Sequence, residues 1–188
     1  LLRFYRSCLQ RHLYAGGERR LLLSKNAAFG SWLPGLHEIC PEARFILCVR
    51  EPLAALSSQI SAIGGARHLF GTAVDGEAFQ RLFLDQFEDT LAQMAETLAH
   101  WPQARAVILD MADLRANPAA LIRRALQTLE QPVGAELAAH LAGLGGSSRS
   151  AHRHGVDNLA LPAGELARRL LPRYHRLLAL PHRIRIPQ

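Results

Sequence analysis

Apolar residues recur along much of the chain at the spacing of one helix face. Leu2, Tyr5 and Leu9 are an example, because positions three or four residues apart lie on the same side of a helix. The longest such stripe runs from Phe79 to Trp101. This spacing predicts helices over residues 1–14, 31–40, 79–101, 121–129, 135–144 and 164–180, and from Pro52 onward.

Three short stretches contain a continuous apolar run: LLLS at residues 21–24, ARFILCV at 43–49 and ARAVILD at 104–110. Continuous apolar runs of this length are typical of parallel strands that are buried on both faces. Glycine and small residues over 65–76, and the polar stretch 143–155, predict loops. The order of elements predicts an α/β fold, in which a small, mostly parallel sheet is flanked by helices and the C-terminal half is rich in helix.

The composition is that of an ordinary folded domain. Apolar residues make up 49% and charged residues 20% of the 188 positions, which predicts one packed domain over residues 1–188. Lys and Arg total 22 against 16 acidic residues, a net charge of +6, and Lys25 is the single lysine. This charge favours an anionic partner without distinguishing nucleic acid, anionic lipid and a phosphorylated cofactor.

The cysteines and the hydropathy of the chain bear on its cellular compartment. Cys8, Cys40 and Cys48 are an odd number without CxxC spacing, which predicts neither a disulfide framework nor a zinc site and favours a reducing, cytoplasmic setting. No apolar run approaches the roughly 20 residues that a transmembrane helix needs. The chain starts at Leu1 already inside a helical pattern, so we expect it to be part of a longer protein.

Two of the predicted strands end in a cation, Lys25 after LLLS and Arg50 after FILCV. In parallel sheets, ligands bind beyond the carboxyl ends of the strands. Arg50 combines a guanidinium with the positive end of the following helix, which suits a phosphate, and the hydroxyl of Ser58 follows eight residues later. Three structural alternatives stay open: Arg50 pairs with Glu51 or another carboxylate at the sheet edge, Ser58 is a small residue that permits close packing, and Lys25 is an exposed loop lysine.

Three segments in this order resemble the sulfotransferase family, in particular its bacterial branch: LLLSKNAAF, CPEARFILCVREPLAALSSQIS and VILDMADLRANPAALIRRAL. The resemblance covers roughly residues 4–130. It implies a P-loop NTPase-like fold and transfer of a sulfuryl group from 3′-phosphoadenosine 5′-phosphosulfate (PAPS). We expect no metal, because positive groups around the leaving phosphate can stabilise the charge that develops there. The resemblance also implies that Arg50 and Ser58 hold the 3′-phosphate of the donor and that Lys25 lies near the transferring group or the acceptor.

The resemblance bears on residues further along the chain. In the family a C-terminal loop can fold over the nucleotide, which makes Arg149 and Arg153 additional candidates for the 3′-phosphate, with surface arginines as the alternative. His152 and His154 have the HxH spacing of some metal sites, but no third ligand is identifiable and a polar loop is the alternative. The stretch MADLRANP is expected to be structural, including Asp113, Leu114 and Pro118.

The chain departs from the family in two places. The family's donor site opens with a strand and a phosphosulfate-binding loop rich in Gly, Ser and Thr; nothing before Lys25 has that form, so we expect this unit upstream of residue 1. The stretch GGSSRS at 145–150 follows a predicted helix and so does not replace the loop. Ala27 stands where some members carry the histidine that deprotonates the acceptor, so the base is expected elsewhere.

Two classes of function remain, an enzyme and a binding module. As an enzyme, the chain is a PAPS-dependent sulfotransferase whose partners are the nucleotide sulfate donor and an acceptor hydroxyl or amine. As a module, it is a non-catalytic nucleotide binder or a helical interaction domain with a basic face. A nucleic-acid role lacks a recognisable motif, and aromatic residues that would stack on bases make up only 6% of the chain. The sequence identifies neither the acceptor nor the oligomeric state.

Overall fold

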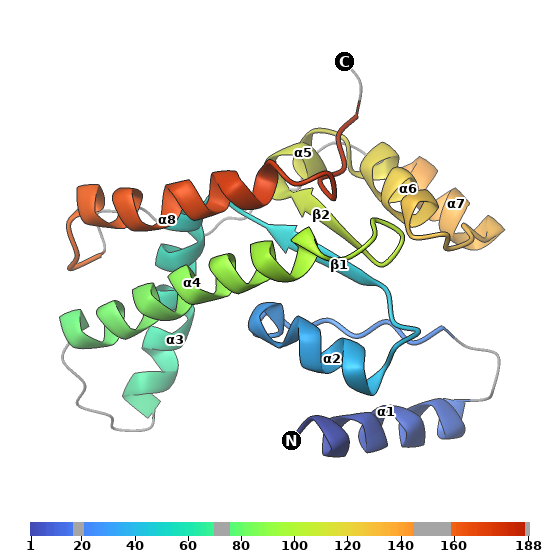
Figure 1. The fold of residues 1–188 in the computed structure, drawn as a ribbon, viewed down its shortest axis with the longest axis horizontal. Helices are drawn as coiled ribbons and strands as arrows, with labels where there is room; N and C mark the ends of the chain where they lie inside the picture. The colour runs from blue at the N-terminus through green and yellow to red at the C-terminus, as the bar shows by residue number, and fades with distance from the viewer. Residues whose placement is uncertain (17–20, 70–75, 145–158, 187–188) are drawn as a thin grey trace. The chain divides into compact units, whose positions relative to one another are not determined.

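The structure is a computed structural model that describes residues 1–16, 21–69, 76–144 and 159–186 (Figure 1). It divides into two compact units, Leu1–Ala43 and Arg44–Gln188. The expectation that the chain forms one domain therefore stays a prediction.

The first unit is built on two helices, α1 (Leu2–Gly16) and α2 (Leu33–Ile39). A short 3-10 helix, η1 (Gly30–Trp32), precedes α2. The two α-helices approach so closely that a Cβ atom at Gly35 would lie 2.5 Å from Cδ1 of Leu2, so the missing side chain permits this contact. Both helices predicted for this part of the sequence are confirmed.

The strand predicted at LLLS is wrong. Residues 21–24 form neither helix nor strand, and Leu21 and Leu23 are 81% and 86% exposed. A strand needs a neighbour for its backbone N–H and C=O groups, and the described residues of this unit contain no strand that could provide one. The segment is held by a side chain instead, because the hydroxyl of Tyr5 lies 2.7 Å from that of Ser24.

The second unit contains a parallel sheet of two strands, β1 (Phe45–Val49) and β2 (Ala106–Asp110) (Figure 1). The register places Val49 opposite Asp110, so the two strands end at the same level. Every residue of β2 is buried, whereas burial alternates along β1 and Ile46 is 41% exposed. Two parallel strands are confirmed here, but burial on both faces is correct for β2 only, because one face of β1 is partly open.

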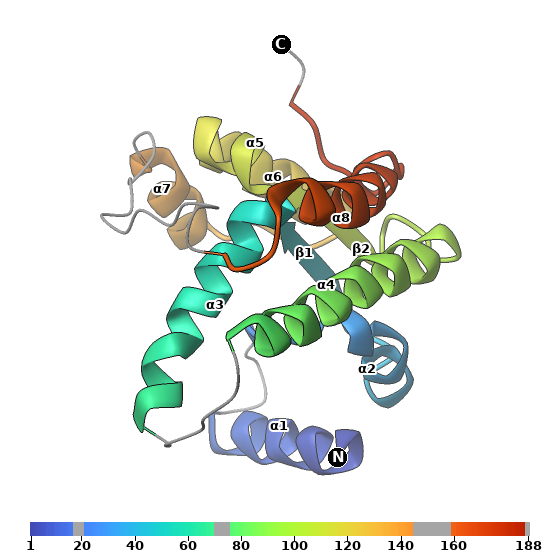
Figure 2. The same ribbon diagram turned by 90° about the vertical axis from the view of Figure 1, so that its left-hand side faces the viewer.

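Helices make up most of the second unit (Figure 2). They are α3 (Pro52–Leu69), α4 (Gly76–Ala99), α5 (Met111–Ala116), α6 (Pro118–Thr128), α7 (Ala135–Gly143) and α8 (Ala163–Leu178). The start of α3 at Pro52 is confirmed, as are the long helix and the three C-terminal ones. The loop predicted over 65–76 begins too early, because α3 continues to Leu69. Each glycine lowers helix stability by about 1 kcal/mol, which does not by itself end a helix.

One face of β2 is covered by α6. Leu121 and Ala125 of this helix and Leu129 at its C-cap recur every four residues and form one buried stripe, which packs against Val107 and Leu109. Burying a leucine side chain contributes about 1.5–3 kcal/mol. This packing fixes β2 and, with it, the edge at which the strand ends.

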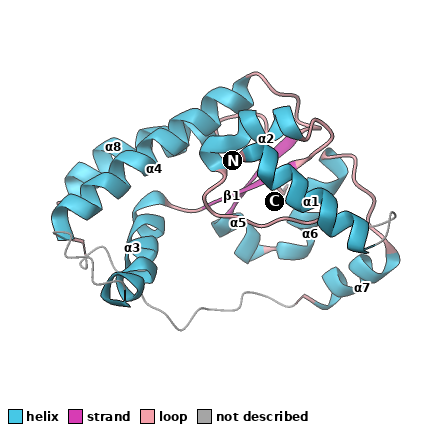
Figure 3. Cartoon of the chain, turned by 90° about the horizontal axis from the view of Figure 1, so that it is seen from below, coloured by secondary structure: helices cyan, strands magenta, loops and turns pink. Residues whose placement is uncertain are grey.

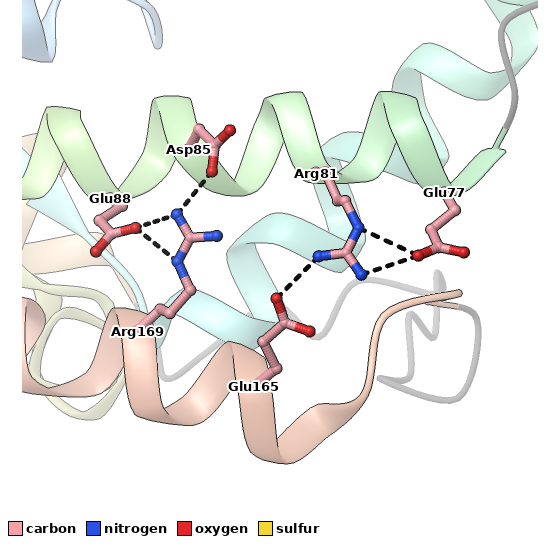
Figure 4. Close-up of polar contacts among 6 residues, drawn as sticks. All are labelled: Glu77, Arg81, Asp85, Glu88, Glu165 and Arg169. Carbon is pink, nitrogen blue, oxygen red and sulfur yellow. Dashed lines mark hydrogen bonds and ion pairs between the residues drawn. The ribbon is translucent and has the colours of Figure 1, made fainter.

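The long helix α4 lies side by side with α8 (Figures 1 and 3). Both helices bury leucines, for example Leu84 and Leu170. Charged side chains line the same contact, and Figure 4 shows the two arginines Arg81 and Arg169 reaching across between the helices. The ion pairs join Arg81 to Glu77 and Glu165, Arg169 to Asp85 and Glu88, and Arg173 to Glu88.

The C-terminal segment, residues 181–186, returns to β2 after α8. The amide of Ile108 donates to the carbonyl of His182 (2.8 Å), and the amide of Ile184 donates to the carbonyl of Ile108 (3.0 Å). The segment therefore satisfies backbone groups in the middle of β2 on the edge that β1 does not use. The sequence pattern did not predict this pairing.

Candidate functional site

Arg50 follows the last residue of β1 and lies, half-buried, at the carboxyl edge of the sheet. Within the described residues, Arg50 has no hydrogen bond and no ion pair. Taking a guanidinium partly out of water costs free energy unless an anion compensates its charge. The edge therefore carries a cation that no described carboxylate neutralises.

Glu51, the next residue, caps the helix that begins there. Its Oε1 accepts a hydrogen bond from the amide of Leu53 (3.0 Å) and its Oε2 one from the amide of Ala54 (2.8 Å). A carboxylate is stabilised at this position because the first amides of a helix have no partner inside the helix. Glu51 thus binds α3 instead of Arg50, and an anion on Arg50 can use these two amides only if Glu51 moves.

Ser58 lies on the same side of α3 as the junction with β1. It follows Glu51 by seven residues, which is about two helical turns, so the two side chains project from the same face of the helix. Ser58 is half-buried, and within the described residues its hydroxyl has no hydrogen-bond partner; its neighbour Ser57 is buried. The geometry is compatible with a hydroxyl directed at a ligand that lies against this side of the helix.

The second strand ends in an acid that is fully engaged. Asp110 is buried; its Oδ1 accepts from the amide of Ala112 (2.9 Å), which caps α5, and its Oδ2 accepts from the hydroxyl of Tyr174 (2.9 Å). Burial and, second, the hydrogen bond to Asp110 raise the pKa of Tyr174 above its usual range, and the nearby charge of Glu51 acts in the same direction. Tyr174 on α8 is therefore a neutral donor that ties this helix to the sheet edge.

Arg183 of the C-terminal segment adds a cation to the same edge. Its Nη2 donates to Oδ2 of Asp113 (2.8 Å) and lies 3.7 Å from Oδ2 of Asp110. Sequence reasoning missed this network, because Tyr174 and Arg183 are 64 and 70 residues from the acids that they bind. The available signal was a pair of acids three residues apart, one ending a buried strand and one following it, a pattern typical of a helix start.

The stretch MADLRANP has structural contacts, as the sequence predicts. Besides its ion pair, Asp113 accepts a backbone bond at its carbonyl from the amide of Asn117 (3.1 Å). Leu114 packs against the core between β2 and α6, and Pro118 opens α6 where its missing N–H costs nothing.

Lys25 belongs to the first unit and is exposed there, in the segment that was predicted to end a strand. Within the described residues its ammonium has no hydrogen bond or ion pair. Arg50 directly precedes α3 and Ser58 lies inside the same helix, while Lys25 lies in the other unit. Its role stays a prediction.

The remaining candidates of the sequence lie in one segment. Arg149, Arg153, His152 and His154 fall outside the described residues. Over the ranges that the structure does describe, no three His, Cys, Asp or Glu side chains gather as a metal site, and no helix is long and apolar enough to cross a membrane. All three cysteines are described, and all are unpaired.

The fold and the edge define an α/β protein with a cationic residue where a parallel strand gives way to a helix, the usual position of a ligand site in such sheets. A family model described as the sulfotransferase family matches residues 2–134. The chain belongs to the sulfotransferase family. No curated protein and no solved structure matches it with significance.

Proposed function

We propose that this protein transfers a sulfuryl group from PAPS to a hydroxyl or amine of an acceptor, and that Arg50 and Ser58 hold the 3′-phosphate of the donor. One observation carries the proposal. Arg50 is a half-buried cation without a partner among the described residues, at a strand end where the neighbouring acids Glu51 and Asp110 are already engaged. Family membership supports sulfuryl transfer in general.

In the proposed reaction, an acceptor oxygen or nitrogen attacks sulfur in line with the bond to the bridging oxygen of the donor. The new bond to sulfur forms while the bond to the bridging oxygen breaks, and adenosine 3′,5′-bisphosphate leaves with that electron pair. The acceptor's proton passes to a base or to water. The protein contributes position and charge stabilisation, with the ammonium of Lys25 proposed to stabilise charge on the bridging oxygen.

Arg50 suits the 3′-phosphate because a guanidinium donates two parallel hydrogen bonds to phosphate oxygens. Ser58 adds a neutral donor from the same side of the junction. Arg149 and Arg153 are proposed as additional contacts to this phosphate. A cytoplasmic setting is also part of the proposal and rests on the three unpaired cysteines.

The test is whether the 3′-phosphate contributes to the affinity of the protein for the nucleotide. Calorimetric titration compares adenosine 3′,5′-bisphosphate with adenosine 5′-monophosphate, which lacks that group. We expect the bisphosphate to bind at least about tenfold more tightly, because a hydrogen bond to a charged group contributes about 1.5–3 kcal/mol. Ser58→Ala should weaken the bisphosphate and leave the monophosphate unchanged, whereas Ser61→Ala, an exposed serine of the same helix, is the matched control.

Equal affinity for the two nucleotides would contradict the assignment of Arg50 and Ser58 to the 3′-phosphate. Binding of neither nucleotide would favour the alternative of a helical interaction module. Binding of both without transfer from labelled PAPS would favour a non-catalytic nucleotide binder.

A further inference from the structure

The carboxyl edge of the sheet carries more acids than bases. Glu51, Asp110 and Asp113 lie there with Arg50 and Arg183. Each carboxylate that is not neutralised lowers the affinity of Arg50 for an anion, because charges about 10 Å apart still interact through a protein interior. A phosphate can bind at this edge only if the charges of these acids are compensated.

Two of the acids are stabilised by helix starts. Glu51 accepts from the amides of Leu53 and Ala54, and Asp110 accepts from the amide of Ala112. The partial positive charge at the start of α3 therefore stabilises the carboxylate of Glu51. The much shorter α5 gives Asp110 only a capping hydrogen bond. Tyr174 gives Asp110 a hydrogen bond but no charge.

Asp110 and Asp113 are left with Arg183 as their shared full positive charge among the described residues. Its Nη2 lies 2.8 Å from Asp113 and 3.7 Å from Asp110. The side chain of Arg183 is only 20% exposed, and its Nε is buried without an acceptor among the described residues. Water therefore screens this charge less than that of a surface arginine.

We propose that Arg183 is a positioning residue of the anion site: it compensates Asp110 and Asp113, so that the carboxyl edge of the sheet admits the phosphate that Arg50 binds. The residue acts through these two acids and does not touch the ligand. The inference rests on the proposed function for the identity of the anion. Arg183 lies beyond the residues 2–134 that the family model matches.

The strand register allows the distance between Arg183 and Arg50 to be estimated. Asp110 lies opposite Val49, the residue before Arg50, and neighbouring strands are about 4.8 Å apart. Adding the length of the Asp110 side chain and the 3.7 Å from its Oδ2 to Nη2 of Arg183 places the guanidinium of Arg183 within about 15 Å of the backbone of Arg50. At this distance one charge changes the affinity for an anion by about three- to tenfold at low salt.

The experiment measures the affinity for two probes, adenosine 3′,5′-bisphosphate and inorganic pyrophosphate, at about 20 mM salt, where screening is weak. Arg183→Gln should weaken both by about three- to tenfold. Arg183→Lys keeps the charge and should stay within about twofold of the wild type. The loss should shrink at about 0.3 M salt, since the screening length is then below the distance involved; a structural defect would persist.

A second variant should change the affinity for both probes in the opposite direction. Asp113→Asn removes an acid whose side chain is partly exposed, and it should tighten both probes by a similar factor. Combining it with Arg183→Gln restores the charge balance and should bring the affinity back toward the wild type. Tyr174→Phe is the matched control, because it removes a hydrogen bond to Asp110 without changing any charge, and should leave both affinities within about twofold.

The outcomes separate the two proposals. If Arg183→Gln and Asp113→Asn both bind like the wild type at low salt while Arg50→Ala loses binding, Arg183 has no such role and the proposed function stands. If pyrophosphate responds as expected but the bisphosphate does not bind, the inference holds and the proposed donor is wrong. If neither probe binds the wild-type protein, the edge is no anion site and both fall.

Discussion

The arginines between α4 and α8 differ from Arg50 in what surrounds them. Arg81 and Arg169 each contact two carboxylates, and each has a contact that crosses from one helix to the other (Figure 4). Arg50 is half-buried at the end of β1, has no partner among the described residues, and follows a strand whose register partner Asp110 is already engaged. The first kind of arginine joins two helices, and the second is the one that we propose for the ligand.

The comparison teaches that arginine content alone says little about function. The chain has a net charge of +6, yet part of its positive charge is used inside the helical layer. What marks a candidate site is a partly buried cation whose neighbouring acids are bound to something else. Variants of the two regions should therefore separate stability from binding.

The largest effect on stability is expected at Glu88, whose side chain is 15% exposed and pairs with both Arg169 and Arg173. Glu88→Ala leaves two guanidiniums with fewer partners and should lower the free energy of unfolding by about 2–3 kcal/mol. Urea denaturation measures this change. Affinity for adenosine 3′,5′-bisphosphate should stay at the wild-type value, and a parallel loss of affinity would show that the two regions are coupled.

Tyr174→Phe should cost about 1.5–3 kcal/mol at pH 7, because it removes the hydrogen bond to the buried carboxylate of Asp110. The raised pKa of Tyr174 adds a pH dependence. Its stabilising contribution is fully present below the unfolded pKa of about 10 and is lost as the pH rises above it, because the unfolded chain then releases the phenolic proton first.

Thermal unfolding from pH 8 to 11 should therefore show a steeper alkaline loss in the wild type than in Tyr174→Phe. Tyr5 and Tyr14 are common to both proteins and cancel in this difference. Parallel curves would contradict the buried, hydrogen-bonded state of Tyr174.

The smallest effect is expected at Arg81, whose side chain is 47% exposed. Its ion pairs with Glu77 and Glu165 lie at the surface, where solvent and salt weaken them. Arg81→Ala should lower the free energy of unfolding the least of these variants, and less still in high salt. A loss as large as that of Glu88→Ala would mean that the α4–α8 contact depends on its charges as much as on its leucines.

Much of the fold could be predicted from the sequence, because β1, β2 and the long helices have clear hydrophobic patterns. The failure at LLLS has a simple physical cause: an apolar run becomes a strand only if a neighbouring edge accepts its backbone hydrogen bonds. Residues 21–24 have no such neighbour among the described residues. Hydrophobic periodicity is a property of one segment, whereas a β-sheet forms only when two segments pair.

The same distinction holds for the site. Arg50 could be found because its place depends on local order: a strand, a cation, a proline and a helix. Asp110, Tyr174 and Arg183 could not, because their meeting depends on how α8 and the C-terminal segment return to β2. The partners of Glu51 also could not be predicted, since a carboxylate beside an arginine can bind either that arginine or the helix start.

The most direct measurement is a paired titration of Arg50→Ala and Arg169→Ala with adenosine 3′,5′-bisphosphate, each accompanied by a melting curve. We predict that Arg50→Ala loses about tenfold to hundredfold in affinity with its melting temperature unchanged, while Arg169→Ala melts earlier and binds normally. If Arg50→Ala binds the nucleotide as tightly as the wild type, Arg50 is not a phosphate-binding residue and the proposed site is contradicted.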